Sequence, residues 1–411
     1  DVTDDVTIIM APDTRIAAAK VACNFYKNPS KKLKLIGVTG TKGKTTTTFM
    51  IKEILEAQGK KVGLIGTVAN YICGKNLGES SRTTPDSLEL QKLFSDMVEA
   101  GAEYAIMEVS SQALKLHRVD GCDFDIGVFT NFSEDHISDH EHPDMEDYFN
   151  SKLKLIERSK ASFINADDFR VSKIKKLLPE KNIKSYGIDN EADLIAKDIT
   201  ITNSSVDFKV KINGKNERVK TGIPGRFSVY NSLAAISVVS KLGVDAETIK
   251  EALLNVRVPG RSELVDNKKG LTIMIDYAHS PESLQSILSA VKSYTRGKVI
   301  SVFGCGGDRD KTKRPIMGKI STSIADFTII TSDNPRTEDP DTIVNEIEVG
   351  AKKAKGKYKK IVNRTEAIKY AINMASKNDI IVLAGKGHET YQEINGIKHH
   401  YDEREIIKEV I

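Results

Sequence analysis

Residues 34–48 read KLIGVTGTKGKTTTT, and this stretch decides the fold class of the first half of the chain. Lys34 to Val38 predicts a short buried strand, and the apolar pattern after the Gly- and Thr-rich turn predicts a helix that ends near Gly59. A strand, a glycine-rich turn and a helix in this order form a context in which backbone N–H groups at the helix N-terminus bind phosphate.

The turn itself, Gly40-Thr41-Lys42-Gly43-Lys44-Thr45-Thr46, has the residue types of a phosphate-binding loop. Lys44 would reach the terminal phosphates of a nucleotide, and Thr45 would ligate Mg²⁺. Only two residues separate the glycines, which is two fewer than in the usual loop. The alternative is a flexible turn, but Lys44-Thr45 between a strand and a helix favours nucleotide binding.

Further strands and helices alternate on both sides of this loop. Apolar runs of strand length occur at 62–65, 104–107, 126–130 and 162–164, and helical patterns cover 87–100, 145–156 and 224–240. Strands that alternate with helices predict an α/β domain with a mostly parallel sheet. The strictly alternating run Val206 to Ile212 and the turn Asn213-Gly214 predict an antiparallel hairpin at the edge of that sheet.

A second α/β domain is predicted after Val258-Pro259-Gly260, which is typical of a domain boundary. Strand patterns at 271–275, 299–303, 327–331 and 379–383 alternate with helices and predict a doubly wound, Rossmann-like sheet. We therefore expect a central nucleotide-binding domain at residues 31–258 and a C-terminal domain at 259–411.

Composition excludes several classes of protein. In 411 residues, 39% are hydrophobic and 29% charged, so a large core is expected rather than disorder. The net charge of +4 is too small to indicate a nucleic-acid partner, and the lysine-rich run at 352–360 is interpreted as a solvated helix end. The longest run without a charged residue has 14 residues, against about 20 for a membrane-spanning helix. The four cysteines lack metal-ligand spacing, and a reduced, cytoplasmic protein without membrane or nucleic-acid partners is predicted.

Candidate metal ligands follow two strands of the first domain. Glu108 comes directly after 104–107, where a carboxylate beside a phosphate-binding loop suits a hard cation such as Mg²⁺. Residues 131–147 contain seven acidic residues and three histidines. His136 is the preferred active-site candidate among them, whereas His140 and His142 are interpreted as solvated loop residues.

Three strand ends of the second domain carry polar clusters. Arg309 follows the strand at 299–303, Asp333-Asn334-Pro335-Arg336 follows 327–331, and Gly385 to Glu389 follows 379–383. Because ligands in such sheets bind at the carboxyl ends of the strands, these side chains are expected to share one crevice. Guanidinium groups bind carboxylates and acidic groups bind ammonium, so the set predicts a site for a zwitterion.

Motifs over nearly the whole chain resemble the Mur ligases, the ATP-dependent amide-bond ligases of bacterial cell-wall synthesis. The resemblance rests on Thr39 to Thr48, Thr83-Thr84-Pro85, Glu108 to Ser111, Thr130-Asn131, Gly225 to Asn231, Pro259-Gly260-Arg261, Asp276 to His279, Gly304 to Arg314, Asp333 to Arg336 and Gly385 to Gln392. The shortened phosphate-binding loop is the form found in this family. Within it, the chain is most similar to the members that add the third residue of the peptidoglycan stem peptide.

The resemblance implies site residues of four kinds. ATP would be bound by Gly40, Thr41, Lys42, Gly43, Lys44, Thr45, Thr46, Asn131, Asn231, Arg261, Asp276 and His279. Two Mg²⁺ ions would be held by Thr45, Glu108, His136 and Lys152, with Lys152 carbamylated; sequence alone would place Lys152 on an exposed helix face. The muramoyl peptide would contact Thr83, Thr84, Ser110 and Arg118. The incoming amino acid would contact Arg309, Asp333, Asn334, Pro335, Arg336, Gly385 and Glu389, and the catalytic residues would be Lys44, Glu108, His136 and Lys152.

The form Asp333-Asn334-Pro335-Arg336 resembles that of members that add meso-diaminopimelate to UDP-MurNAc-L-Ala-D-Glu through an acyl phosphate. Arg336 would pair with the distal carboxylate, which lysine lacks. Three alternatives remain: a lysine-adding ligase, a folylpolyglutamate-type ligase, and an ATP-binding protein that lacks activity. The family's N-terminal uridine-diphosphate-binding domain would be represented only by its trailing segment at residues 1–30, and a monomer is expected.

Overall fold

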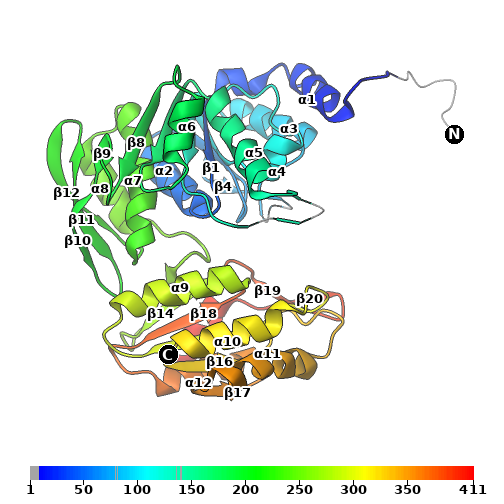
Figure 1. Ribbon diagram of the computed structural model, residues 1–411, viewed down its shortest axis with the longest axis vertical. Coiled ribbons are helices and arrows are strands. Elements are labelled where there is room, and N and C mark those ends of the chain that lie inside the picture. Colours follow the sequence, from blue (N-terminus) through cyan, green and yellow to red (C-terminus); the bar gives the residue numbers. More distant parts are fainter. Residues whose placement is uncertain (1–8, 79, 81, 136, 139–140) are drawn as a thin grey trace. The chain divides into compact units, whose positions relative to one another are not determined.

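The computed structural model of the chain describes residues 9–411 except 79, 81, 136, 139 and 140. The chain divides into two compact units (Figure 1). The first contains the residues up to Lys197 with 209–219 and 230–254, and the second contains 198–208, 220–229 and 255–411. Among the described residues, no helix combines the length and the apolar composition needed to span a membrane.

A nine-stranded sheet forms the centre of the first unit, with strand order β4-β3-β2-β5-β1-β6-β7-β8-β9. Its strands are β1 (Lys34–Thr39), β2 (Val62–Ile65), β3 (Tyr71–Ile72), β4 (Lys75–Asn76), β5 (Tyr104–Glu108), β6 (Ile126–Phe129), β7 (Ala161–Asn165), β8 (Ile183–Gly187) and β9 (Leu194–Ile195). The strands from β2 to β9 in this order are parallel, and β3 and β4 form an antiparallel edge.

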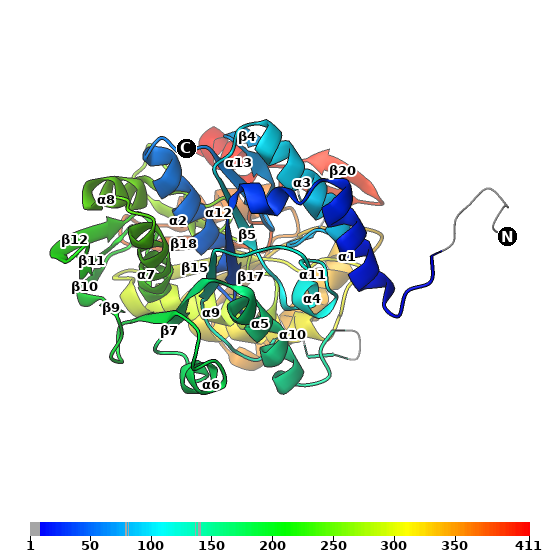
Figure 2. The same ribbon diagram turned by 90° about the horizontal axis from the view of Figure 1, so that it is seen from above.

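Helices of the first unit connect these strands. They are α1 (Thr14–Phe25), the 3₁₀ helix η1 (Pro29–Lys32), α2 (Lys44–Ala57), α3 (Ser87–Glu99), α4 (Ser111–Lys115), α5 (Met145–Arg158) and α6 (Val171–Leu177). Helix α1 lies beside α3 in both views (Figures 1 and 2). The cores include Leu35 and Met107 packed with α3 and α4, and Phe129 packed with α5 and α6.

Strand β1 is buried along almost its whole length, which explains its uninterrupted apolar sequence. It lies between β5 and β6, so later strands of the chain are added on both edges of β1. This is the place where the carboxyl ends of neighbouring strands leave a crevice for ligands. The loop after β1, the end of β5 and the end of β6 therefore share one edge of the sheet.

The predicted hairpin at 206–221 forms, but not at the edge of the parallel sheet. Strands β10 (Lys197–Ile201), β11 (Val206–Ile212) and β12 (Lys215–Thr221) make a separate three-stranded sheet. Asn213 and Gly214 have φ values of 48° and 85°, as the predicted two-residue turn requires. Helices α7 (Arg226–Lys241) and α8 (Ala246–Asn255) follow this sheet in the chain.

The second unit contains a six-stranded sheet with strand order β13-β14-β18-β15-β16-β17 and a two-stranded sheet of β19 and β20. The strands are β13 (Glu263–Leu264), β14 (Thr272–Asp276), β15 (Val299–Phe303), β16 (Phe327–Ile330), β17 (Tyr358–Lys360), β18 (Ile380–Ala384), β19 (Tyr391–Ile394) and β20 (Ile397–His400). The helices are α9 (Pro281–Tyr294), α10 (Lys313–Ile324), α11 (Pro340–Ala354), α12 (Arg364–Met374) and α13 (Glu403–Val410).

Alternate residues of the central strands build two cores on opposite faces of this sheet. In β18, Ile380 and Val382 pack with residues of α9, α10 and α11, whereas Ile381 and Leu383 pack with α12 and α13. Such two-sided burial explains why β18 is apolar at every position. The α/β fold with mostly parallel sheets is thus confirmed for both halves of the chain.

Candidate active site

The loop after β1 requires glycine at two positions. Gly40 and Gly43 have φ values of 145° and 85°, in the range that side chains disfavour. A Cβ atom on Gly40 would lie 1.9 Å from Oγ1 of Thr130, and one on Gly43 would lie 2.5 Å from Oδ1 of Asn231. Sterics and backbone conformation together therefore explain the spacing of the two glycines.

Asn131, at the end of β6, holds the backbone of this loop. Its carbonyl oxygen accepts from the Thr41 amide (2.9 Å), and its Oδ1 accepts from the Lys42 amide (2.9 Å). Its Nδ2 donates to the Lys42 carbonyl at 2.9 Å. Helix α2 begins directly after the loop and has no side-chain cap, so its first N–H groups can bind an anion.

Two lysines donate to a single carbonyl oxygen in the loop. Lys44 Nζ lies 2.9 Å and Lys152 Nζ lies 2.8 Å from the oxygen of Gly40. Lys152 is 1% exposed and lies over the ring of Tyr148. Burial and the neighbouring Lys44 charge hold the pKa of Lys152 well below its ordinary value. The exposed position that sequence alone would give Lys152 is therefore wrong.

Glu108, the last residue of β5, is buried and connects the loop to a second segment. Its carboxylate accepts from Oγ1 of Thr45 at 3.0 Å and from the amide and hydroxyl of Thr67 at 2.8 and 3.1 Å. A carboxylate and a threonine hydroxyl are the oxygen ligands that Mg²⁺ prefers. No group of three His, Cys, Asp or Glu side chains suited to a metal occurs in the part of the chain that the structure describes.

The predicted peptide-binding residues gather around the end of β5. Thr83 Oγ1 lies 3.0 Å from the hydroxyl of Thr67, and Thr84 Oγ1 donates to the Glu108 carbonyl at 2.9 Å. The Ser110 amide donates to Thr84 Oγ1 at 3.1 Å, and Arg118 donates to the Thr84 carbonyl at 3.1 Å. The four predicted contacts therefore lie beside the phosphate-binding loop, with Thr67 as a further member.

The interpretation of His142 as a solvated residue is wrong. This side chain is 0% exposed, and its Nε2 lies 2.9 Å from Ser111 Oγ while Nδ1 lies 2.6 Å from Asp147 Oδ2. Its two polar partners compensate for its burial, and burial lowers its pKa. His136 and His140 lie outside the described residues.

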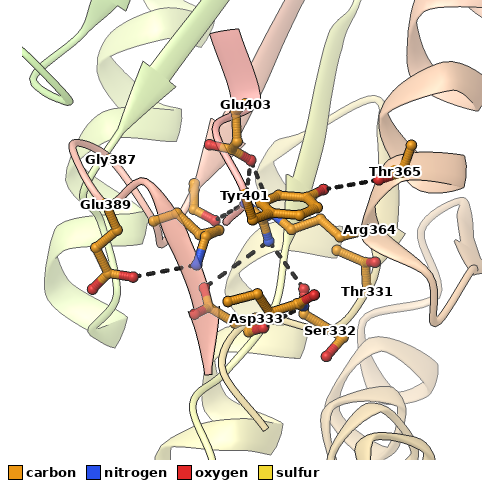
Figure 3. Close-up of polar contacts among 12 residues, drawn as sticks. Thr331, Ser332, Asp333, Arg364, Thr365, Gly387, Glu389, Tyr401 and Glu403 are labelled. Carbon is orange, nitrogen blue, oxygen red and sulfur yellow. Dashed lines mark hydrogen bonds and ion pairs between the residues drawn. The ribbon is translucent and has the colours of Figure 1, made fainter. Parts of the chain in front are cut away.

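The amino-acid candidates of the second unit also lie together. Asn334 Nδ2 donates to Glu389 Oε2 at 2.9 Å, and the buried Lys386 Nζ lies 3.1 Å from Asn334 Oδ1 and 3.3 Å from Glu389 Oε2. Burial, with a further contribution from Asp333, raises the pKa of Glu389. Figure 3 shows Asp333 and Glu389 in the network that joins the ends of β16 and β18.

A buried ion pair contacts the backbone at both of these strand ends. Arg364 and Glu403 are 2% and 1% exposed, and two guanidinium nitrogens of Arg364 lie 2.8 Å from Glu403 Oε1. The other donors of Arg364 reach the carbonyls of Ser332 (3.3 Å) and Ala384 (3.1 Å), which directly precede the two predicted segments (Figure 3). Arg364 thus positions both segments, although its place at the start of α12 gave no sequence signal.

Arg309 and Arg336 approach each other around Gly306. A Cβ on Gly306 would lie 2.9 Å from Nη1 of Arg336 and 3.8 Å from Cγ of Arg309. Arg336 itself donates from Nη1 to the Gly307 carbonyl at 2.7 Å. Arg336 and the aliphatic part of Arg309 thus lie near the same glycine; their role in binding a zwitterion stays a prediction. Pro335 and Gly385 lie within these segments.

The last three predicted nucleotide contacts lie at the start of the second unit. Asp276 accepts from the Ser262 amide at 2.8 Å, and burial raises its pKa. The Arg261 guanidinium lies 5.0 Å from the ring of Tyr277, which also packs against the rings of His279 and His388. Nε of Arg261 and Nδ1 of His388 are buried and have no hydrogen-bond partner among the described residues.

Comparison with known proteins identifies two family domains in this chain. Residues 38–239 match the Mur ligase middle domain, and residues 260–387 match the Mur ligase, glutamate ligase domain. Among curated relatives, the UDP-N-acetylmuramoyl-L-alanyl-D-glutamate–2,6-diaminopimelate ligase of Caldanaerobacter subterraneus subsp. tengcongensis is 51% identical over 99% of this chain and 84% of its own length. A ligase of the same name from Clostridium acetobutylicum is 48% identical over 98% of this chain and 83% of its own length.

Solved structures agree with this assignment. A structure of a UDP-N-acetylmuramoyl-L-alanyl-D-glutamate–2,6-diaminopimelate ligase superposes with a TM-score of 0.72, at 32% identity, over 98% of this chain and 83% of that chain. Mycobacterium tuberculosis folylpolyglutamate synthase shares the fold, with a TM-score of 0.71 at 17% identity, over 91% of this chain and 92% of that chain. The chain belongs to the Mur ligase family of ADP-forming acid–amino-acid ligases.

Proposed function

We propose that the protein joins meso-diaminopimelate to UDP-MurNAc-L-Ala-D-Glu, with ATP as the source of energy. The observation that carries the proposal is the segment Asp333 to Arg336 with Glu389, which groups two acids, an amide and a guanidinium at neighbouring strand ends. The relatives named above act on the same two substrates according to their names.

ATP fits the loop at Gly40 to Thr46. The uncapped N-terminus of α2 offers N–H groups to phosphate oxygens, and Lys44 lies beside the loop to offset negative charge. In the second unit, Nε of Arg261 and Nδ1 of His388 have no hydrogen-bond partner among the described residues, so each can still form a hydrogen bond with a ligand. We assign Thr46, Asn131 and Asn231 to the same nucleotide. We propose the domain boundaries 31–258 and 259–411.

Mg²⁺ fits the oxygen atoms of Thr45 and Glu108, which already lie 3.0 Å apart. The metal would supply charge neutralisation on the phosphates. Two ions are proposed, with His136 and a carbamylated Lys152 as further ligands. Burial and the Lys44 charge lower the pKa of the Lys152 amine, which favours the form that this modification needs: its lone pair attacks CO₂, an N–C bond forms and one proton is released. The resulting carboxylate would attract Lys44 and the metal, which an unmodified lysine cannot do.

The reaction follows from these assignments. The terminal carboxylate of the muramoyl dipeptide, held by Thr83, Thr84, Ser110 and Arg118, takes the γ-phosphoryl group, and ADP leaves. The amine of diaminopimelate attacks the acyl carbon, an amide bond forms and phosphate departs. Lys44 stabilises the charge that develops on the transferred group. We expect the protein to act as a monomer in the cytoplasm, without a membrane or nucleic-acid partner.

Steady-state release of ADP tests the proposal. We expect release only when the muramoyl dipeptide nucleotide and diaminopimelate are both present with Mg²⁺. Lysine should replace diaminopimelate poorly, since it would leave the Arg336 guanidinium without its carboxylate. ADP release that does not depend on diaminopimelate would contradict the assignment, and equal rates with lysine would favour a lysine-adding ligase.

A further inference from the structure

Strand β19 lies along the segment Asp333 to Arg336 and holds its backbone. Gln392 Nε2 donates to the Asp333 carbonyl at 2.6 Å, and the Glu393 amide donates to Asn334 Oδ1 at 3.0 Å. The Arg336 amide donates to the Glu393 carbonyl at 3.0 Å, and the Arg336 carbonyl accepts from the Asn395 amide at 2.7 Å. The Gln392 side chain and the backbones of Glu393 and Asn395 thus hold this segment without the Glu393 side chain.

Arg336 needs this support because its φ value is 50°, in the left-handed region. A conformation that is rare for arginine persists only where surrounding contacts determine it. The hydrogen bonds on both sides of Arg336 provide these contacts. The position at which its side chain leaves the backbone is therefore fixed before any ligand binds.

The Glu393 side chain then acts on the guanidinium of Arg336. Glu393 Oε2 lies 3.2 Å from Nε of Arg336, while Nη1 donates to the Gly307 carbonyl at 2.7 Å. Nη2 has no partner among the described residues. The two side chains are 22% and 25% exposed, so the pair is half-buried rather than freely solvated. Nε and Nη1 of the guanidinium thus have partners, and Nη2 remains available to a ligand.

We propose that Glu393 is a positioning residue that makes the site specific for an amino acid with a distal carboxylate. The inference rests on the proposed function. By occupying Nε, Glu393 restricts the rotation of the guanidinium and leaves Nη2 to bind the second carboxylate of diaminopimelate. A guanidinium that is already oriented loses less conformational entropy when the ligand binds, which lowers the KM for that ligand. The ion pair also compensates the Arg336 charge in the free protein.

The alternative effect of Glu393 has the opposite sign. A carboxylate beside Arg336 could compete with the substrate carboxylate, in which case removal of Glu393 would tighten binding. The geometry argues against competition, because Glu393 contacts Nε and the unpartnered atom is Nη2. An arginine has five N–H donors and can serve carboxylates on two edges at once.

A double-mutant cycle on the full chain tests the proposal. Glu393→Ala should raise the KM for diaminopimelate about tenfold, with kcat and the KM for ATP changed less than about twofold. Glu393→Gln keeps the size of the side chain and an oxygen beside Nε but removes the charge of the ion pair, so it should recover only part of the loss. In the Arg336→Ala background, Glu393→Ala should have no further effect on this KM. His399→Ala, an exposed substitution on the adjacent strand β20, serves as the matched control and should behave as the wild type.

Three results would overturn the proposal: an unchanged KM in Glu393→Ala, a lowered KM, or an equal effect of Glu393→Ala with and without Arg336. The last would indicate a general structural role. Thermal unfolding of each variant shows whether it is folded, and Glu393→Gln replaces Glu393→Ala if the latter is not. If the wild type shows no diaminopimelate-dependent release of ADP, the proposed function fails as well. If the wild type is active but the effects of Glu393→Ala and Arg336→Ala on the KM are independent, only the role of Glu393 is refuted.

Discussion

Lys152 is the residue whose chemistry depends most on its surroundings. An amine buried to 1% exposure beside a second lysine, with a carbonyl oxygen as its hydrogen-bond acceptor, is in an environment that disfavours the ammonium form. A carbamate at this position would be negatively charged and would pair with Lys44. The two lysines, which share the Gly40 carbonyl oxygen as acceptor, therefore make a place that suits an anion or a modified side chain.

Replacement of Lys152 should show this directly. We expect Lys152→Ala to lower kcat by about 100-fold or more, because charge stabilisation at the phosphoryl group is lost. Removal of CO₂ should lower the activity of the wild type, and bicarbonate should restore it. A labelled carbamate carbon, observed by ¹³C NMR, measures the modification. Lys154→Ala on the same helix is the control, and full activity of Lys152→Ala would contradict the account.

His388 should make stability depend on pH. Burial, with the charges of Arg261 and Arg404, lowers its pKa to about 4, against 6.5 for an unperturbed histidine. Between these values the unfolded chain binds more protons than the folded chain, so stability is lost as the pH falls from 6.5 towards 4. Over this pH interval, the free energy of unfolding of His388→Gln should fall by about 1–3 kcal/mol less than that of the wild type. Urea unfolding at pH 7.5 and 4.5 measures the difference, and equal losses in both proteins would refute it.

At the scale of elements, α10 and α11 approach more closely than their side chains would normally permit. A Cβ on Gly350 would lie 1.7 Å from the Pro315 carbonyl oxygen, and one on Gly318 would lie 2.1 Å from the Ile347 carbonyl oxygen. The two helices are therefore in backbone contact, and each depends on the glycine of the other. This contact supports the face of the sheet that packs on α9, α10 and α11.

Gly350→Ala should therefore destabilise the protein by about 1–3 kcal/mol, because the helices must separate. Val349→Ala lies next to it on a side chain that is 50% exposed, and its effect should stay within about 0.5 kcal/mol. Denaturant titration of both variants gives the comparison. Similar values for the two substitutions would show that the close contact contributes little to stability.

Sequence patterns predicted the buried elements better than the exposed ones. Strands such as β2 and β15 lie where the apolar runs predicted them, because a strand buried on both faces has few polar positions. Strand β17, with the sequence Tyr-Lys-Lys, and the exposed β20 have no such pattern and were not predicted. The lysine-rich run at 352–360 therefore ends a helix and also enters a strand, where only the helix end was expected.

Site residues were predictable where a polar or glycine residue follows the end of a strand. They were not predictable where a charged residue acts because it is buried. Gly40, Glu108 and Asp333 have this signature, whereas Arg364 and Glu403 resemble ordinary surface charges in the sequence. Their burial follows from tertiary contacts between segments far apart in the chain. The same holds for His142, whose partner Ser111 is 31 positions away.

For the whole molecule, we expect one chain to join two specific substrates at the cost of one ATP. Mass spectrometry of the muramoyl product tests this most directly, with ATP, Mg²⁺, UDP-MurNAc-L-Ala-D-Glu and an equal mixture of diaminopimelate and lysine. We expect a single product, heavier by diaminopimelate less one water, with one ADP formed per amide bond. A lysine adduct as the main product, or ADP without any adduct, would contradict it.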